Sequence, residues 1–126
     1  MDLEALVSSE PSIEIVSEAR RGSPLSKPKE LKGLKPSFTY KWDRYVSFQV
    51  FVLDDDIWVK HGYWCFGKAW FKLSNVANVQ RGHRAETVQK INLQCIQAER
   101  YIMPDINSFD DIMTKVWQLK DEGKDK

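Results

Sequence analysis

The chain is poor in cysteine and has no apolar run that approaches the length of a membrane-spanning helix. Its two cysteines, Cys65 and Cys95, both lie in apolar stretches, which favours reduced thiols in a core over a disulfide framework. The N-terminus lacks the charged-then-apolar pattern of a secretory signal. From these absences we expect a soluble, intracellular protein with no membrane partner.

The sequence also lacks an excess of positive or negative charge, because its formal net charge is only +1. The charges are nevertheless segregated: residues 1–18 hold five acidic side chains and no basic one, and residues 19–45 hold eight basic and two acidic ones. A near-neutral total argues against a strong non-specific binder of polyanions. The segregation leaves room for one basic surface.

Motifs of catalysis and metal binding are absent from the sequence. It has no Gly-rich phosphate loop, no Gly-x-Ser-x-Gly elbow and no convincing nucleophile–base set. Cys65, Cys95, His61 and His83 lack the close Cys-x-x-Cys pairs of structural zinc sites, and a turn explains the acidic run at 54–56. We therefore expect a protein that is not an enzyme and that uses no cofactor or metal.

The composition of residues 1–36 is typical of a disordered N-terminal tail and a basic linker, because frequent prolines, glycines and serines disfavour a long helix or strand. A short helix from Ser12 to about Arg21 would fit within this segment. We expect the folded domain at 37–122, followed by a C-terminal tail at 123–126.

Alternation of apolar and polar residues predicts strands in the folded domain. The first covers 46–52, turns at the aspartates 54–56 and returns over 57–60, giving a hairpin that ends at His61 and Gly62. Further strands are predicted at 63–73, 90–97 and 100–103, with a polar loop and room for one helical turn at 74–88.

A C-terminal helix is predicted from residue 108 to about 122. After Ser108, apolar residues recur at helical spacing, namely Phe109, Ile112, Met113, Val116 and Trp117. Strands followed by a terminal helix predict an α+β fold, a small antiparallel sheet with a C-terminal helix.

Aromatic residues are concentrated in the strands, with twelve of the fifteen between Phe38 and Phe71. Because side chains alternate along a strand, Trp64, Phe66, Lys68, Trp70 and Lys72 share one face and the smaller residues between them share the other. Rings mixed with cations can stack flat groups and hold negative charge, which suits nucleic acid. The alternative is an ordinary half-exposed sheet that its lysines keep soluble.

Cations and polar groups of the folded domain supply candidate phosphate and ribose contacts. The basic candidates are Lys60, Lys68, Lys72, Arg81, Arg84 and Lys90, and the polar candidates on the strand predicted at 90–97 are Asn92 and Gln94. An ordinary solvated surface is the alternative for all of them.

The stretch from Trp64 to Lys72, WCFGKAWFK, resembles the Trp-x-Phe-Gly-Lys-x-x-Phe-Lys segment of the nineteen-kilodalton RNA-silencing suppressors of tombusviruses. The likeness extends over about residues 40–120, with Trp42 upstream of the motif. At its mass of 14.7 kDa the chain looks like the shorter suppressor of the related aureusviruses.

The resemblance implies a homodimer whose two sheets join into one concave surface that cradles duplex small RNA in the host cytoplasm without reading its sequence. It implies no catalysis, and it leaves open a direct contact with host silencing proteins. Rings near the N-terminus of such proteins stack on duplex ends, which points to Tyr40 and Trp42, with packing beneath the sheet as the alternative for Trp42. These lie two residues apart rather than the family's three, so we expect loose selection of duplex length.

The sequence itself also favours a homodimer, because a small sheet leaves an exposed edge that must be covered or paired. Met113 and Trp117 are larger than one thin domain easily buries, so we expect them at the dimer interface. An alternative function is a small protein-interaction module that uses the aromatic face and binds no RNA.

Overall fold

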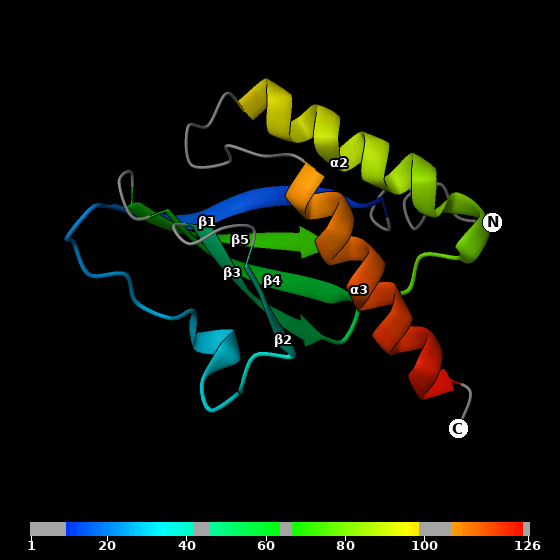
Figure 1. Ribbon diagram of the computed structural model, residues 1–126, viewed down its shortest axis with the longest axis horizontal. Helices are drawn as coiled ribbons and strands as arrows, with labels where there is room; N and C mark the ends of the chain where they lie inside the picture. The colour runs from blue at the N-terminus through cyan, green and yellow to red at the C-terminus, as the bar shows by residue number, and fades with distance from the viewer. Residues whose placement is uncertain (1–9, 42–45, 64–66, 99–106, 125–126) are drawn as a thin grey trace.

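Five antiparallel strands form one sheet, and two α-helices pack on one of its faces (Figure 1). The computed structural model describes residues 10–41, 46–63, 67–98 and 107–124. The strands are β1 (Ser12–Arg20), β2 (Phe38–Lys41), β3 (Val46–Leu53), β4 (Asp56–Tyr63) and β5 (Gly67–Ser74), in the spatial order β1-β5-β4-β3-β2. The predicted α+β fold with an antiparallel sheet and a C-terminal helix is confirmed.

The helices follow the strands in the sequence. They are α2 (Arg84–Ala98) and α3 (Asn107–Lys124), and two single 3₁₀ turns, η1 (Lys29–Leu31) and η2 (Arg81–His83), precede β2 and α2. No helix within the described ranges is long and apolar enough to cross a membrane. The helix predicted from 108 to about 122 is confirmed as α3.

The predicted hairpin is confirmed as β3 and β4, with Leu53 paired to Asp56 across the turn. Asp54 takes the left-handed conformation, with φ of 55°, which short acidic side chains tolerate well. The predicted break at His61 and Gly62 is wrong, because β4 continues through both to Tyr63. His61 pairs with Phe48 of β3 and Ala69 of β5, and its side chain is buried in the core. A break in the strand at this point would remove that side chain from the core.

The helix considered between Ser12 and Arg21 is wrong, because these residues form β1 along the edge of β5. Ile13 and Ile15 pack against the core, and their polar neighbours are exposed, which is a strand period. The expected tail at 1–36 therefore contains an ordered strand, which the sheet stabilises through long-range pairing.

Gly67 is required where β1 and β5 approach each other. It has φ of 131°, and a Cβ atom built on it would collide with the carbonyl oxygen of Ala19. The glycine of the Gly-Lys motif thus has a structural reason that does not depend on any ligand.

The strand predicted at 90–97 is also wrong, because these residues belong to helix α2. Ile91 and Cys95, four residues apart, face the core together, whereas Leu93 is 56% exposed. A short run of alternating apolar residues fits both the strand period and the helix period, and packing against the sheet selected the helix. The strand predicted at 100–103 lies outside the described residues.

The main core lies between the sheet and the two helices. The sheet contributes Phe48, Val59 and Phe71, and α3 contributes an apolar stripe that includes Phe109 and Val116. Phe109 meets Phe71 edge-to-face, with ring centroids 6.1 Å apart. The two helices therefore cover the centre of this face.

The opposite face of the sheet carries a second, smaller core. The segment 21–37, which we call the strap, runs from the end of β1 to the start of β2 and includes η1 (Figure 1). Its Leu31 is completely buried with Phe51, Trp58 and Trp70, and Leu25 packs beside them. The predicted basic linker is thus packed on the sheet.

We predict that Gly67→Ala lowers the free energy of unfolding by roughly 2 kcal/mol or more, because it adds strain at a positive φ and a collision with β1. Chemical denaturation measures the loss. Gly62→Ala is the matched control, since its Cβ would meet only the hydroxyl of Ser47, at 3.9 Å. Equal stability of the two variants would contradict this account.

We also predict that stability falls in acid through His61. Its side chain is fully buried, both ring nitrogens lack hydrogen-bond partners within the described residues, and burial lowers its pKa from 6.5 to about 4. The unfolded chain therefore takes up a proton over this range while the folded chain does not. The stability is complete above pH 6.5 and declines by roughly 3 kcal/mol as the pH falls to about 4.

Denaturation of His61→Leu between pH 7 and pH 4 checks this, and the variant should show a flatter pH dependence than the wild type. His83→Leu is the control, because His83 is exposed in η2. If the His61 variant remained as acid-sensitive as the wild type, the carboxylates alone would account for the acid sensitivity.

Candidate nucleic-acid interface

Three lysines project from the sheet face that the helices leave free. Strand register puts Lys60 beside Trp70, and Lys72 beside Trp58, on the side opposite the helix-covered core. Lys68 follows two residues before Trp70 on β5 and shares this side. We call this the lysine face. The predicted common face of Lys68, Trp70 and Lys72 is confirmed, whereas Trp64 and Phe66 lie outside the described residues.

The three lysines differ in how far their charge is compensated. Lys72 lies 3.8 Å from a carboxylate oxygen of Asp56 and 5.1 Å above the ring of Trp58. Lys68 is exposed and Lys60 is half-buried, and within the described part of the chain neither forms an ion pair. Lys60 and Lys68 are therefore the more available partners for an anion.

The aromatic rings of the lysine face are not available for stacking. Phe51, Trp58 and Trp70 are only 2–3% exposed, because Leu25 and Leu31 of the strap cover them. The expectation of an open aromatic surface is therefore wrong for Trp70. Large apolar rings on the second face of a sheet need a cover, and the strap supplies it.

The strap brings further cations to the same side of the molecule. Residues 21–37 hold five basic side chains and one acidic one. Lys29, Lys32 and Lys35 are all exposed, whereas Lys27 donates a hydrogen bond of 2.6 Å to the carbonyl of Leu34 and lies 5.0 Å from the centre of the Phe51 ring. The basic run at 19–45 indicated that these lysines could bind an anion, but the sequence alone did not place the run on the sheet.

Tyr40 faces away from the lysine face. On β2 it pairs with Phe48, and its hydroxyl donates a hydrogen bond of 2.7 Å to Asp111 of α3. Its ring also lies near Phe48, with centroids 6.0 Å apart. The prediction that Tyr40 contacts RNA alongside the lysines does not fit this placement, and Trp42 lies outside the described residues.

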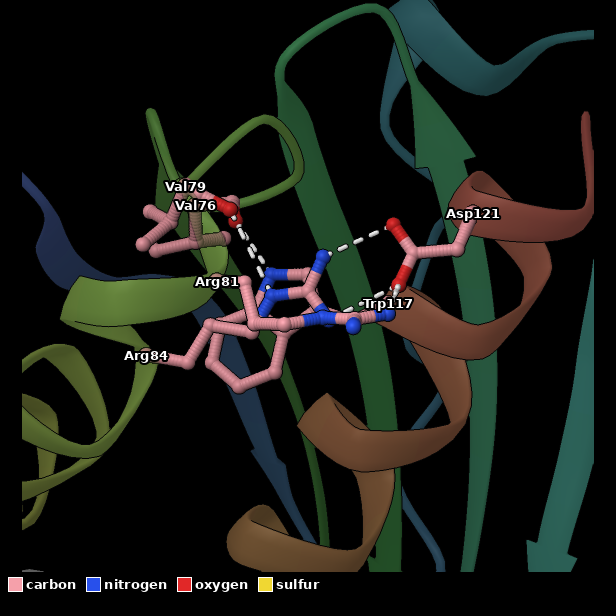
Figure 2. Close-up of polar contacts among 6 residues, drawn as sticks. All are labelled: Val76, Val79, Arg81, Arg84, Trp117 and Asp121. Carbon is pink, nitrogen blue, oxygen red and sulfur yellow. Dashed lines mark hydrogen bonds and ion pairs between the residues drawn. The ribbon is translucent and has the colours of Figure 1, made fainter. Parts of the chain in front are cut away.

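Arg84 is engaged in the helix layer, as Figure 2 shows. Its guanidinium donates two hydrogen bonds to the Asp121 carboxylate, at 3.0 and 2.9 Å, and stacks over Trp117 at 5.0 Å. Trp117 in turn donates a hydrogen bond of 2.9 Å to the carbonyl of Val76. This set joins α2, α3 and the loop after β5, so Arg84 acts in folding rather than as a free phosphate contact.

Arg81 lies beside the same carboxylate but is held loosely. Its side chain is 87% exposed and 3.7 Å from Asp121. It remains accessible to a polyanion, but it belongs to η2, at the start of the helix layer, and not to the lysine face.

Lys90, Asn92 and Gln94 are carried by α2 instead of the predicted strand. Lys90 forms an ion pair of 3.0 Å with Glu10. The side-chain oxygens of Asn92 and Gln94 are buried and have no hydrogen-bond partner within the described residues. These three residues lie in the helix layer, so they do not form one surface with Lys60, Lys68 and Lys72.

Met113 and Trp117 are buried within a single chain, at 1% and 4% exposure. The expectation that one thin domain could not bury them is wrong, because both belong to the core between the helices and the sheet, and Trp117 also bonds Val76 in the loop after β5. Substitution of Trp117 would therefore disturb the fold directly and would not report on a dimer.

The cysteine and histidine residues considered for zinc are dispersed. His61 and Cys95 lie in the core, His83 is exposed and Cys65 is outside the described residues. Burial raises the pKa of the Cys95 thiol to about 12, so this thiol stays protonated. Among the described residues, no three histidine, cysteine or acidic side chains come together as a metal site.

Comparison with protein-family models, curated proteins and solved structures finds no match to this chain. Function is therefore inferred from the residues and their arrangement.

We predict that Arg84→Ala lowers the free energy of unfolding by roughly 1–3 kcal/mol, because it removes two charge-assisted hydrogen bonds and the stacking on Trp117. Arg81→Ala is the matched control at the same carboxylate and should change stability by less than about 0.5 kcal/mol. Thermal or chemical denaturation compares the two. Equal effects would show that the bidentate geometry contributes nothing.

Proposed function

We propose that the protein binds double-stranded RNA without reading its sequence and thereby sequesters it from RNA silencing in the host cytoplasm. The lysine face carries the proposal. Two lysines of the WCFGKAWFK motif, Lys68 and Lys72, share it with Lys60 of the neighbouring strand, on the side away from the helices. Cations held at fixed positions on a sheet can follow a phosphate backbone.

Sequence indifference follows from the chemistry of this surface. Lysines bind phosphates as point charges and carry no information about bases. The deep, narrow groove of A-form RNA also hides the base edges from side chains. Polar neighbours such as Gln49 and Thr39, both exposed on β3 and β2, can reach ribose hydroxyls, which distinguishes RNA from DNA.

A second copy of the chain extends this surface in our proposal. Five strands give a sheet only about 20 Å wide at the usual spacing of neighbouring strands. β1 and β2 are the two edges of the sheet, and an edge strand offers unpaired backbone groups to another chain. Because Met113 and Trp117 are already buried, we assign the dimer contact to an edge strand.

The alternative is a protein-interaction module that uses the aromatic face. It has less support, because binding to Phe51, Trp58 and Trp70 would first require the strap to leave them. Salt dependence separates the two functions, since lysine–phosphate binding weakens steeply with salt and apolar binding does not.

We predict that replacing Lys60, Lys68 and Lys72 by glutamine weakens binding to a short RNA duplex. Each lost phosphate contact should reduce the slope of log K against log salt by about 0.9, so a total loss of roughly 2–3 is expected. Gel-shift titration over a salt series measures it. The control replaces Lys90, Lys115 and Lys120 of the helix layer, with the same change of charge.

Equal weakening by the two sets would show that only net charge matters, and absence of duplex binding by the wild type at low salt would exclude the proposed function. Duplex DNA of equal length should bind far more weakly, and unrelated RNA sequences should bind within a few-fold of one another. Unlabelled long duplex should compete with short duplex, because Tyr40 faces the helices and is not placed to stack on a duplex end together with Trp42.

A further inference from the structure

The strap is fixed to the sheet by its own side chains and backbone. Leu31 has no exposed surface and packs with Phe51, Trp58 and Trp70. Successive backbone hydrogen bonds fold the strap around Leu31, from Leu31 to the carbonyl of Pro28, from Lys32 to that of Lys29 and from Leu34 to that of Leu31. The strap is thus an ordered and packed part of the fold.

Both ends of the strap are also tied to the sheet. At its C-terminal end the amide of Ser37 donates a 2.7 Å hydrogen bond to the carbonyl of Val50, and the amide of Val52 donates to the Ser37 hydroxyl at 3.2 Å. At its N-terminal end Ser23 closes a turn onto the carbonyl of Arg20, at 2.9 Å. Its position over the lysine face is therefore set at three places.

Anchoring Leu31 inward turns its neighbours outward. Lys29, Lys32 and Lys35 are all exposed, and within the described residues none of them forms an ion pair. Lys27 is the exception, because it bonds the carbonyl of Leu34. Three uncompensated cations are thus held above the same sheet face that presents Lys60 and Lys68.

We infer that the strap is a phosphate-binding element in its own right, in which Lys29, Lys32 and Lys35 contact the backbone of duplex RNA. The inference rests on the proposed function. In this arrangement the buried tryptophans are the anchor of the strap and do not stack on bases. The RNA contact surface then consists of the strap lysines together with Lys60 and Lys68 on the same side of the sheet.

A removable lid is the competing role for the strap. Opening it would expose Leu31 and three aromatic rings to water. The lysines of a lid would leave the face together with it. The two roles predict opposite effects of loosening the anchor, which makes them separable.

The first test replaces Lys29, Lys32 and Lys35 by glutamine and measures binding to a short RNA duplex over a salt series. We expect the slope of log K against log salt to fall by about 2–3 and affinity at moderate salt to fall roughly ten-fold or more. The helix-layer set of Lys90, Lys115 and Lys120 again serves as the control of equal charge. Wild-type slope and affinity in the strap variant would overturn the inference.

The second test is Leu31→Ala, which keeps every charge but removes the anchor. Leu31 lies in the smaller core, so circular dichroism and thermal unfolding should show that the main fold is retained. We expect binding to weaken several-fold. Tighter binding would instead identify the strap as a lid and overturn the inference.

These outcomes are distinct from failure of the proposed function. If the wild type bound no duplex RNA, both proposals would fail together. If the wild type bound and the Lys60, Lys68 and Lys72 variant weakened while the strap variants did not, the proposed function would stand and only the role of the strap would be wrong.

Discussion

Large apolar side chains on both faces of one small sheet are the constraint on which the rest of this structure depends. Phe48, Val59 and Phe71 point to one side and Phe51, Trp58 and Trp70 to the other. Each face needs a cover that excludes water. The helices α2 and α3 cover the first, and the strap, the only remaining described segment long enough to cross the sheet, covers the second.

This double cover also divides the charges. In the helix layer, Arg84 and Arg81 share Asp121, and Lys90 pairs with Glu10. On the other side, Lys60, Lys68 and the exposed strap lysines have no such pairing within the described residues, and Lys72 lies 3.8 Å from Asp56. Cations already paired within the protein contribute little to binding a polyanion, so the side of the strap is the better phosphate surface.

The helix α2 and the strand β1 show why part of the fold could not be predicted. Ile91, Leu93 and Cys95 alternate like a strand, yet Ile91 and Cys95 also lie four apart, and only contact with the sheet chose between the two periods. The strand β1 could not be predicted for a different reason. Its short apolar alternation stands in a segment rich in proline and glycine, and the residues of β5 with which it pairs are 47 to 62 positions away in the sequence.

The sequence by itself determined the β3–β4 hairpin, the helix α3 and the shared face of Lys68 and Lys72, because each depends on local periodicity or on a local turn. Only the tertiary structure decided that Trp58 and Trp70 are covered by Leu31, that Arg84 is bound by Asp121 and that Tyr40 turns toward Asp111. These outcomes join residues that lie far apart in the sequence. Their energy comes from burial and pairing across the fold, which no local pattern specifies.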